Sequence, residues 1–234
     1  MLQEYKNHVE ERASLGIPPL PLNAEQTASV VELLKNPPEG EASLLLDLLT
    51  NRTPAGVDPA AYIKAAFLTD LAKGEATSPL INKEDATRLL GTMLGGYNVE
   101  SLIDLLKDEE VGEIAADGLA KTLLMFNSKH DVIELAKENK NAQRVVNSWT
   151  NAEWFTSKPE LPKIIKAIVF RVDGEINTDD LSPAPDAPSR PDIPLHALSM
   201  LTKTFKDPIK TIEKLEESGL PVVFVGDVVG TGSS

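Results

Sequence analysis

Residues 221–234, PVVFVGDVVGTGSS, decide the fold of the C-terminal part of this chain. The β-branched run from Val222 to Val225 is too short for a helix and predicts a buried strand. The glycine-rich turn that follows it permits positive φ angles and a close approach of the backbone to a ligand. Consecutive N–H groups in such a turn can form an anion-binding nest, with Ser233 and Ser234 as further donors. The alternative is that these last residues are a flexible tail.

Length and charge limit the class of protein. The chain has 234 residues, which predicts one large domain or two small ones. Hydrophobic residues make up 41%, enough to build a core. The net charge of −13 repels phosphate backbones and argues against a general nucleic-acid binder.

Cysteine and histidine usage limits the chemistry. The chain contains no cysteine, which excludes disulfides, thiol catalysis and a cysteine-ligated metal within it. Its three histidines are scattered, without metal-ligand spacing, so we expect no metal site in this chain. The N-terminus is polar, and no apolar run approaches the roughly 20 residues of a membrane span, so we expect a cytoplasmic protein.

The first two thirds of the chain predict helix after helix. Apolar stripes separated by Pro, Gly and Asn turns mark the segments 5–15, 23–36, 41–51, 59–73, 82–94, 98–107, 111–126, 131–138 and 142–155. Asn23, Asp58 and Asn82 are the expected N-caps, with Gln26 and Asp85 at capping-box positions.

Several of these segments are apolar on two sides, as expected of helices that pack between neighbours. This favours a HEAT-like α-solenoid, and a plain helical bundle is the alternative. Residues 1–158 show no paired carboxylates, no nucleophile beside a base and no phosphate loop. Such an array most often binds a partner or holds domains in register.

The pattern changes after residues 159–162. Residues 163–172 predict a strand, 173–175 a turn, and 177–194 a long proline-rich loop. Helices are expected at 195–205 and 208–217, before the strand at Val222. This order predicts an α/β unit in which the loop and the glycine-rich turn line one site. The fold class is therefore multidomain, α then α/β, with domains at 1–158 and 163–234.

The proline-rich loop offers a candidate binding residue. Its prolines stiffen the backbone around Arg190, and a guanidinium is suited to bidentate binding of a carboxylate. The alternative is a surface arginine paired with Asp186 or Asp192. At the start of the loop, Thr178 and Asp179 are either part of a site or a turn cap.

Three motifs in this order resemble the swivel domain of the aconitase family, and its bacterial B branch in particular: residues 178–184 (TDDLSPA), residues 189–191 (SRP), and residues 226–234 (GDVVGTGSS). Residues 1–36 and 90–98 are also similar to that branch, so the resemblance covers nearly the whole chain.

The resemblance implies a HEAT-like domain followed by a truncated swivel domain. It implies a hydro-lyase that interconverts citrate and isocitrate, or their 2-methyl relatives, through cis-aconitate in the tricarboxylic acid cycle. The family uses a [4Fe–4S] cluster on later domains. By resemblance, Arg190 grips a substrate carboxylate, Ser233 is the catalytic base and Ser234 binds a carboxylate.

The sequence also departs from the family pattern. The family motif continues with an arginine after the second serine, where this chain ends, and no cysteine is present to hold the cluster. We therefore expect an N-terminal portion that is inactive alone. The alternative is a non-catalytic helical-repeat interaction module. The branch is associated with homodimerisation through the helical domain and with mRNA binding by the cluster-free form, although the charge of −13 counts against RNA binding.

Overall fold

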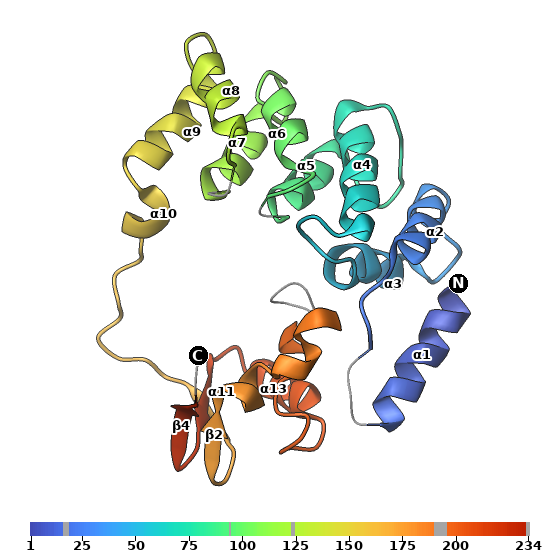
Figure 1. Cartoon of the computed structure of the whole chain (residues 1–234), viewed down its shortest axis with the longest axis vertical. Helices are drawn as coiled ribbons and strands as arrows, with labels where there is room; N and C mark the ends of the chain where they lie inside the picture. Colours follow the sequence, from blue (N-terminus) through green and yellow to red (C-terminus); the bar gives the residue numbers. More distant parts are fainter. Residues whose placement is uncertain (16–18, 94, 123–124, 190–195, 233–234) are drawn as a thin grey trace. The chain divides into compact units, whose positions relative to one another are not determined.

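A computed structural model describes residues 1–15, 19–93, 95–122, 125–189 and 196–232 (Figure 1). The chain divides into two compact units, residues 22–159 and residues 1–21 together with 160–234. Residues 22–159 form helices, and the described strands all lie after residue 160. The predicted order of an α part followed by an α/β part is confirmed, while the domain limits 1–158 and 163–234 stay a prediction.

Helices follow one another through residues 22–159. They are α2 (Ala24–Lys35), α3 (Ala42–Asp47), the π-helical turn η1 (Leu48–Arg52), α4 (Pro59–Lys73), α5 (Lys83–Gly91), α6 (Val99–Leu105), α7 (Gly112–Lys121), α8 (Ser128–Leu135), α9 (Lys140–Thr150) and α10 (Glu153–Thr156). The main series of helix contacts runs α2–α4, α4–α5, α5–α7 and α7–α9. Helices α6 and α8 contact each other, α6 also contacts α7, and α8 also contacts α9. The helices therefore form a progressive array in which each helix meets elements close to it in sequence (Figure 1).

The predicted N-caps are confirmed. Asn23 and Gln26 form a reciprocal capping box at the start of α2. The Asp58 carboxylate accepts a hydrogen bond from the Ala60 N–H, and the Asn82 side chain accepts one from the Asp85 N–H. Each cap satisfies an N–H group that the first helical turn leaves without a partner, so these polar residues fix where α2, α4 and α5 begin.

Several predicted helices are shorter than the sequence pattern suggested. The helix expected over 82–94 ends at Gly91, and the one expected over 98–107 ends at Leu105. The helix expected over 111–126 ends at Lys121, because the next residue, Thr122, has an extended backbone with φ −89° and ψ 100°. The helix expected over 142–155 is interrupted at Ala152, whose φ of +50° separates α9 from α10. Left-handed backbone conformations at non-glycine residues end a helix whatever the apolar pattern beyond them.

The core of the helical unit consists of leucine, valine and alanine side chains that are fully or almost fully buried. The largest are Leu22, Leu34, Leu45, Leu48, Leu49, Leu68, Leu90, Leu102, Leu106 and Leu119. Between α5 and α7, the packing is backbone against backbone. A Cβ atom on Gly118 would lie 2.9 Å from the Gly91 Cα, and one on Gly91 would lie 3.0 Å from the Gly118 Cα. The two helix backbones can therefore approach this closely only because both positions are glycine.

Replacing Gly118 by alanine is expected to lower the free energy of unfolding by about 1–2 kcal/mol. Helix propensity alone predicts the opposite sign, because alanine is about 1 kcal/mol more favourable than glycine within a helix. A decrease in the free energy of unfolding therefore shows that crowding outweighs helix propensity. Urea denaturation measures it, with the exposed α7 substitution Glu113→Ala as the control. A more stable Gly118→Ala chain would contradict the close crossing.

An ion-pair cluster links the start of α5 to the loop before α7. Lys83 Nζ lies 2.8 Å from Asp108 Oδ2 and 3.1 Å from Glu110 Oε2. Hydrogen bonds to Asp108 and then Glu110 raise the pKa of Lys83. Burial raises the pKa of Asp108, but hydrogen bonds from Lys83 and from the backbone N–H groups of Val111 and Glu110 outweigh it, so its pKa lies below the ordinary value of 3.8.

Asp108→Asn should destabilise the chain at neutral pH and not at strongly acidic pH. A lowered carboxyl pKa in the folded state stabilises the fold above the ordinary pKa, and this contribution is lost as the pH falls through the folded value. The difference in unfolding midpoint between the two chains should therefore shrink as the pH falls below 3.8. The control is Asp131→Asn, which changes an exposed aspartate on α8. A pH-independent difference would contradict the lowered pKa of Asp108.

The second unit is an α/β structure. Its elements are α1 (Leu2–Ser14), β1 (Ile168–Arg171), β2 (Glu175–Asn177), α11 (Thr178–Leu181), the 3-10 helix η2 (Ala184–Ser189), α13 (Pro208–Glu216), β3 (Val222–Val225) and β4 (Val228–Thr231). Strands β1 and β3 pair in parallel, as do β2 and β4, so the described strands form two separate two-stranded sheets. In β1–β3, Ile168 lies opposite Val222 and Phe170 lies opposite Phe224.

Several local predictions for this unit are wrong. The strand expected from residue 163 begins at Ile168. Residue 175, expected in a turn, opens β2, and the glycine-rich turn contains β4. The strand from Val222 to Val225 alternates between half-buried and exposed residues and is not fully buried. The helix expected over 195–205 is helical only at residues 196–197 of its described part, and turns begin at residue 198, before Leu201 with its φ of +58°.

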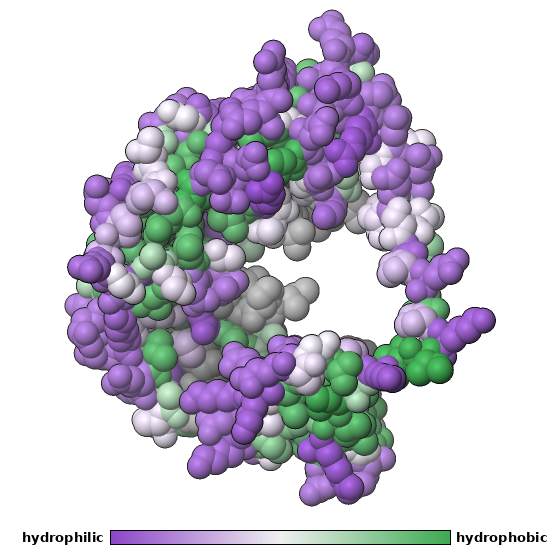
Figure 2. All heavy atoms as spheres, turned by 180° about the vertical axis from the view of Figure 1, so that it is seen from behind, coloured by the Kyte–Doolittle hydropathy of each residue, from purple (hydrophilic) through white to green (hydrophobic). Residues whose placement is uncertain are grey.

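A small apolar core holds the unit together. Its buried members are Phe170, Val172, Ile176 and Leu201. The Phe170 ring makes edge-to-face contacts with Phe205 at 4.9 Å and with Phe224 at 5.5 Å between ring centroids. Several strand valines are exposed, namely Val169, Val223, Val225, Val228 and Val229, and Figure 2 shows apolar atoms at the surface over this unit. No helix in the described part of the chain is both long and apolar enough to cross a membrane.

Candidate functional site

The parallel pairing of β2 with β4 brings together two of the three sequence motifs, the segment that begins at Thr178 and the glycine-rich segment 226–234. Glu175 lies opposite Val228 and Ile176 opposite Val229, and an irregularity after Ile176 then sets Asn177 opposite Thr231. Because the strands are parallel, their carboxyl ends meet at one edge. The predicted convergence of the Thr178–Asp179 loop and the glycine-rich turn is confirmed for the described residues of both.

Backbone contacts lock this pairing at the opposite end of the strands. The Asp227 N–H donates to the Gly174 carbonyl at 2.9 Å, and the Gly174 N–H donates to Asp227 Oδ2 at 3.1 Å. A Cβ atom on Gly226 would lie 3.1 Å from both the Gly174 carbonyl oxygen and the Ile176 side chain. The turn before β2 and the turn before β4 are thus joined, which fixes the register of the pair.

The chain leaves β2 through a capped helical turn. The Asn177 side chain accepts a hydrogen bond from the Asp180 N–H at 2.8 Å, and Asp180 Oδ2 accepts one from the Asn177 N–H at 3.0 Å. The Leu201 N–H donates to the Asp180 carbonyl at 2.7 Å, which ties α11 to the core. The cap is thus formed by Asn177 and Asp180 and not by Thr178 and Asp179, the residues that the sequence offered for it. The capped turn lies beside the glycine-rich strand, at Gly232.

Gly232 lies directly against Thr178. A Cβ atom on Gly232 would lie 2.8 Å from Thr178 Oγ1, and the φ of Gly232 is +110°. One residue earlier, the Thr231 hydroxyl donates a hydrogen bond to the Glu175 carboxylate. The last described residues of the chain are thus held at the carboxyl end of β2 by contacts that a larger residue at position 232 would disturb.

The three predicted site residues, Arg190, Ser233 and Ser234, lie outside the described residues. Their described neighbours are Ser189, at the end of η2, and Gly232, beside Thr178. The roles assigned to the three residues stay predictions.

Sequence reasoning missed one polar group near this loop. His196 Nε2 lies 3.0 Å from the Pro183 carbonyl oxygen, and its Nδ1 lies 3.4 Å from Ser182 Oγ. If Nε2 carries the proton and donates to Pro183, Nδ1 is left to accept from the serine hydroxyl. Nothing in the local sequence pattern marks this contact, because the two residues lie 14 positions apart.

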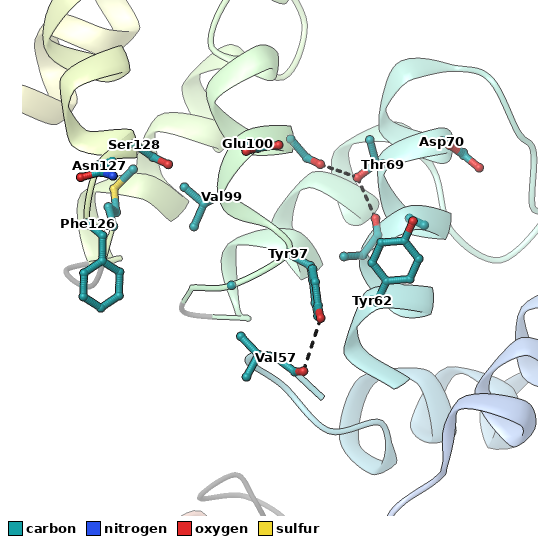
Figure 3. Close-up of a pocket in the computed structure, with 15 residues that line it drawn as sticks. Val57, Tyr62, Thr69, Asp70, Tyr97, Val99, Glu100, Phe126, Asn127 and Ser128 are labelled. Carbon is teal, nitrogen blue, oxygen red and sulfur yellow. Dashed lines mark hydrogen bonds between the residues drawn. The ribbon is translucent and has the colours of Figure 1, made fainter. Parts of the chain in front are cut away.

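A pocket lies within the helical unit. It has a volume of about 720 Å³ and is lined by residues of α4, α6 and the segments 96–97 and 125–128 (Figure 3). Tyr62 and Tyr97 form an edge-to-face pair with ring centroids 5.2 Å apart, and the Tyr97 hydroxyl lies 3.5 Å from the Val57 carbonyl oxygen. Thr69 Oγ1 lies 2.7 Å from Ser101 Oγ.

The residues of this chain do not fit an iron–sulfur cluster. Such clusters are held by cysteine thiolates, and the sequence contains none. Within the described ranges, no group of three or more His, Asp or Glu side chains is arranged to hold a metal ion.

A helical array followed by an α/β unit, with two motif segments meeting at one strand edge, is the arrangement expected of an N-terminal module of the aconitase family. Family models agree with this class. The aconitate B N-terminal domain matches residues 4–155, and the aconitate hydratase 2 N-terminus matches residues 167–234. The chain therefore belongs to the aconitate B N-terminal domain family, and the resemblance seen in the sequence is confirmed.

Individual relatives cover the whole chain. It is 59% identical over 246 residues to aconitate hydratase B of Pseudomonas aeruginosa, 58% over 245 residues to that of Escherichia coli, and 57% over 236 residues to that of Synechocystis sp.. All of this chain is covered, but only 27–28% of each relative. The chain thus spans little more than a quarter of the length of these relatives.

Gly232→Ala should disturb the start of α11, whereas Gly230→Ala should not. Both glycines have positive φ, +110° and +81°, so both substitutions strain the backbone, but only at Gly232 would the new methyl group meet Thr178. NMR should show displaced amide signals at residues 177–180 for Gly232→Ala alone. Equal displacement by the two variants would show that backbone strain, and not contact with Thr178, carries the effect.

Proposed function

We propose that this chain is the N-terminal portion of an aconitate hydratase, and that it supplies part of the site that binds the tricarboxylate substrate. The observation that carries the proposal is the contact between Thr178 and Gly232, which sets the two family motifs side by side. The identities of 57–59% to aconitate hydratases B support the same assignment. The reaction proposed for the complete protein interconverts citrate and isocitrate, or the 2-methyl series, through cis-aconitate in the cytoplasmic tricarboxylic acid cycle.

The proposed reaction removes a proton from the carbon beside a carboxylate and a hydroxyl group from the neighbouring carbon. Ser233, as an alkoxide, is the proposed base for that proton. Arg190 and Ser234 are proposed to hold substrate carboxylates, because a guanidinium and hydroxyl or N–H donors stabilise the negative charge that develops there. The chain delivers Ser233 and Ser234 directly after Gly232, whose position beside Thr178 supports this assignment.

The cluster and the remaining domains are proposed to lie in the rest of the protein. A [4Fe–4S] cluster supplies an open iron site to the hydroxyl group in this class of reaction, and this chain has no cysteine with which to hold one. We therefore expect no hydratase activity from the chain alone. In family terms, residues 1–158 are a HEAT-like domain and residues 163–234 the start of a swivel domain.

The helical unit is proposed to serve as an interaction and homodimerisation domain of the same protein. The progressive packing from α2 to α9 supports this role, because such an array presents a long surface to a partner. Binding of mRNA by the cluster-free protein is the weaker part of the proposal, since the chain carries a net charge of −13.

A chimera tests the proposed half-site. Residues 1–234 would replace the matching segment of the Pseudomonas aeruginosa relative, and citrate turnover would be followed after cluster reconstitution. The parent chimera should be active. Ser233→Ala should lower kcat by roughly 100-fold or more, as expected for loss of a general base. Arg190→Ala and Ser234→Ala should mainly raise KM, because each removes a substrate contact.

Matched controls separate these effects from misfolding. Ser218→Ala and Arg171→Ala change an exposed serine and an exposed arginine of the same unit, and both should leave kcat and KM unchanged. An active chimera that tolerates Ser233→Ala without loss would refute the assignment of the base.

A further inference from the structure

Four exposed apolar residues converge on the pocket of the helical unit. Val57, Tyr62, Tyr97 and Phe126 are 76%, 58%, 41% and 81% exposed, and all four line it (Figure 3). They come from three separate parts of the chain, so folding, and not local sequence, gathers them. Large apolar side chains gathered on a surface in this way mark a binding surface more often than isolated ones do.

The charge lining this pocket is of one sign. Asp70 and Glu100 are its ionised residues, both exposed, and none of the described residues that line it is basic. Lys73, whose charge acts on Asp70, is already bound to Asp104 at 2.9 Å. The pocket thus offers carboxylates and ring faces, which together suit a cation with an apolar stem.

The tyrosine pair favours a cation in particular. In an edge-to-face pair, the ring that presents its edge keeps both of its faces uncovered by its partner. A guanidinium or ammonium group over such a face is attracted by the π electrons, and Glu100 on α6 adds a carboxylate to the same pocket.

Close backbone contact fixes the position of the two segments that carry Val57 and Tyr97. A Cβ atom on Gly96 would lie 2.4 Å from the Gly56 carbonyl oxygen, and both glycines have positive φ angles. The segments that carry Val57 and Tyr97 therefore touch through their backbones directly before these side chains. The pocket is preformed on this side, which lowers the ordering cost of binding.

We propose that this pocket docks a basic segment of a partner protein, which inserts an arginine or lysine side chain against the tyrosine pair and Glu100. Apolar neighbours in that segment cover Val57 and Phe126. Nucleic acid is disfavoured as an occupant, since its phosphates would meet the Asp70 and Glu100 carboxylates. The inference specifies the interaction role proposed for the helical unit and is independent of the proposed hydratase half-site.

Selection from a random library of displayed 12-residue peptides on the whole chain tests the inference. Selected peptides should carry arginine or lysine beside apolar residues, and their binding should weaken with added salt. Tyr62→Ala and Glu100→Gln should each weaken binding about two- to fivefold, the range expected for an exposed cation–π contact or ion pair.

Two controls are matched to these variants. Phe155→Ala removes an aromatic ring that is 57% exposed and outside the pocket, and Glu109→Gln neutralises an exposed acid outside it. Both should bind the selected peptides as the unmodified chain does. Three outcomes would overturn the proposal: the selected peptides carry no basic residues, all four variants bind the peptides equally, or the library yields no binding peptide.

Sedimentation of the peptide-free chain tests the competing occupant. If the chain forms dimers that Tyr62→Ala dissociates, a second copy of the chain fills the pocket and the proposal is wrong. Citrate turnover by the chimera with Tyr62→Ala should remain unchanged, so failure of the docking site and failure of the half-site are distinguishable.

Discussion

The parallel pairing of β2 with β4 is the constraint on which the candidate site depends. Hydrogen bonds between Gly174 and Asp227 start the pair in register, and the buried side chain of Ile176 anchors it in the core. The irregularity after Ile176 sets Asn177 opposite Thr231. From there the two chain segments have little freedom, because Asn177 caps α11 and Gly232 lies against Thr178.

The helical unit relies on a related device. Glycine pairs replace side-chain packing with backbone contact at Gly91 with Gly118 and at Gly56 with Gly96. The first pair sets the crossing of α5 and α7. The second pair positions Val57 and Tyr97, which line the pocket of the helical unit. In both units, therefore, the candidate binding features are positioned by close backbone approach, and larger side chains at these glycines would separate the elements that carry them.

The sequence predicted the parts of the fold that depend on local chemistry. Caps such as Asn23 and Asp58 mark helix starts because their hydrogen bonds reach only two or three residues. Strands β2 and β4 were missed because glycine marks both segments as turns: Gly174 directly precedes β2, and Gly230 lies within β4. The turns that replace the helix expected over 195–205 likewise involve tertiary contact, since the N–H of the left-handed Leu201 bonds to the Asp180 carbonyl. The convergence of the two motifs was predictable from parallel topology, but the contact between Gly232 and Thr178 was not.

The most direct test is a nuclear Overhauser experiment on the isotopically labelled chain, aimed at Thr178 and Gly232. The account predicts a cross-peak between the Thr178 side chain and the Gly232 α protons, together with cross-strand contacts between Ile176 and Val229. Absence of both, in a chain whose β1–β3 contacts are present, would show that the two motifs do not meet and would contradict the half-site.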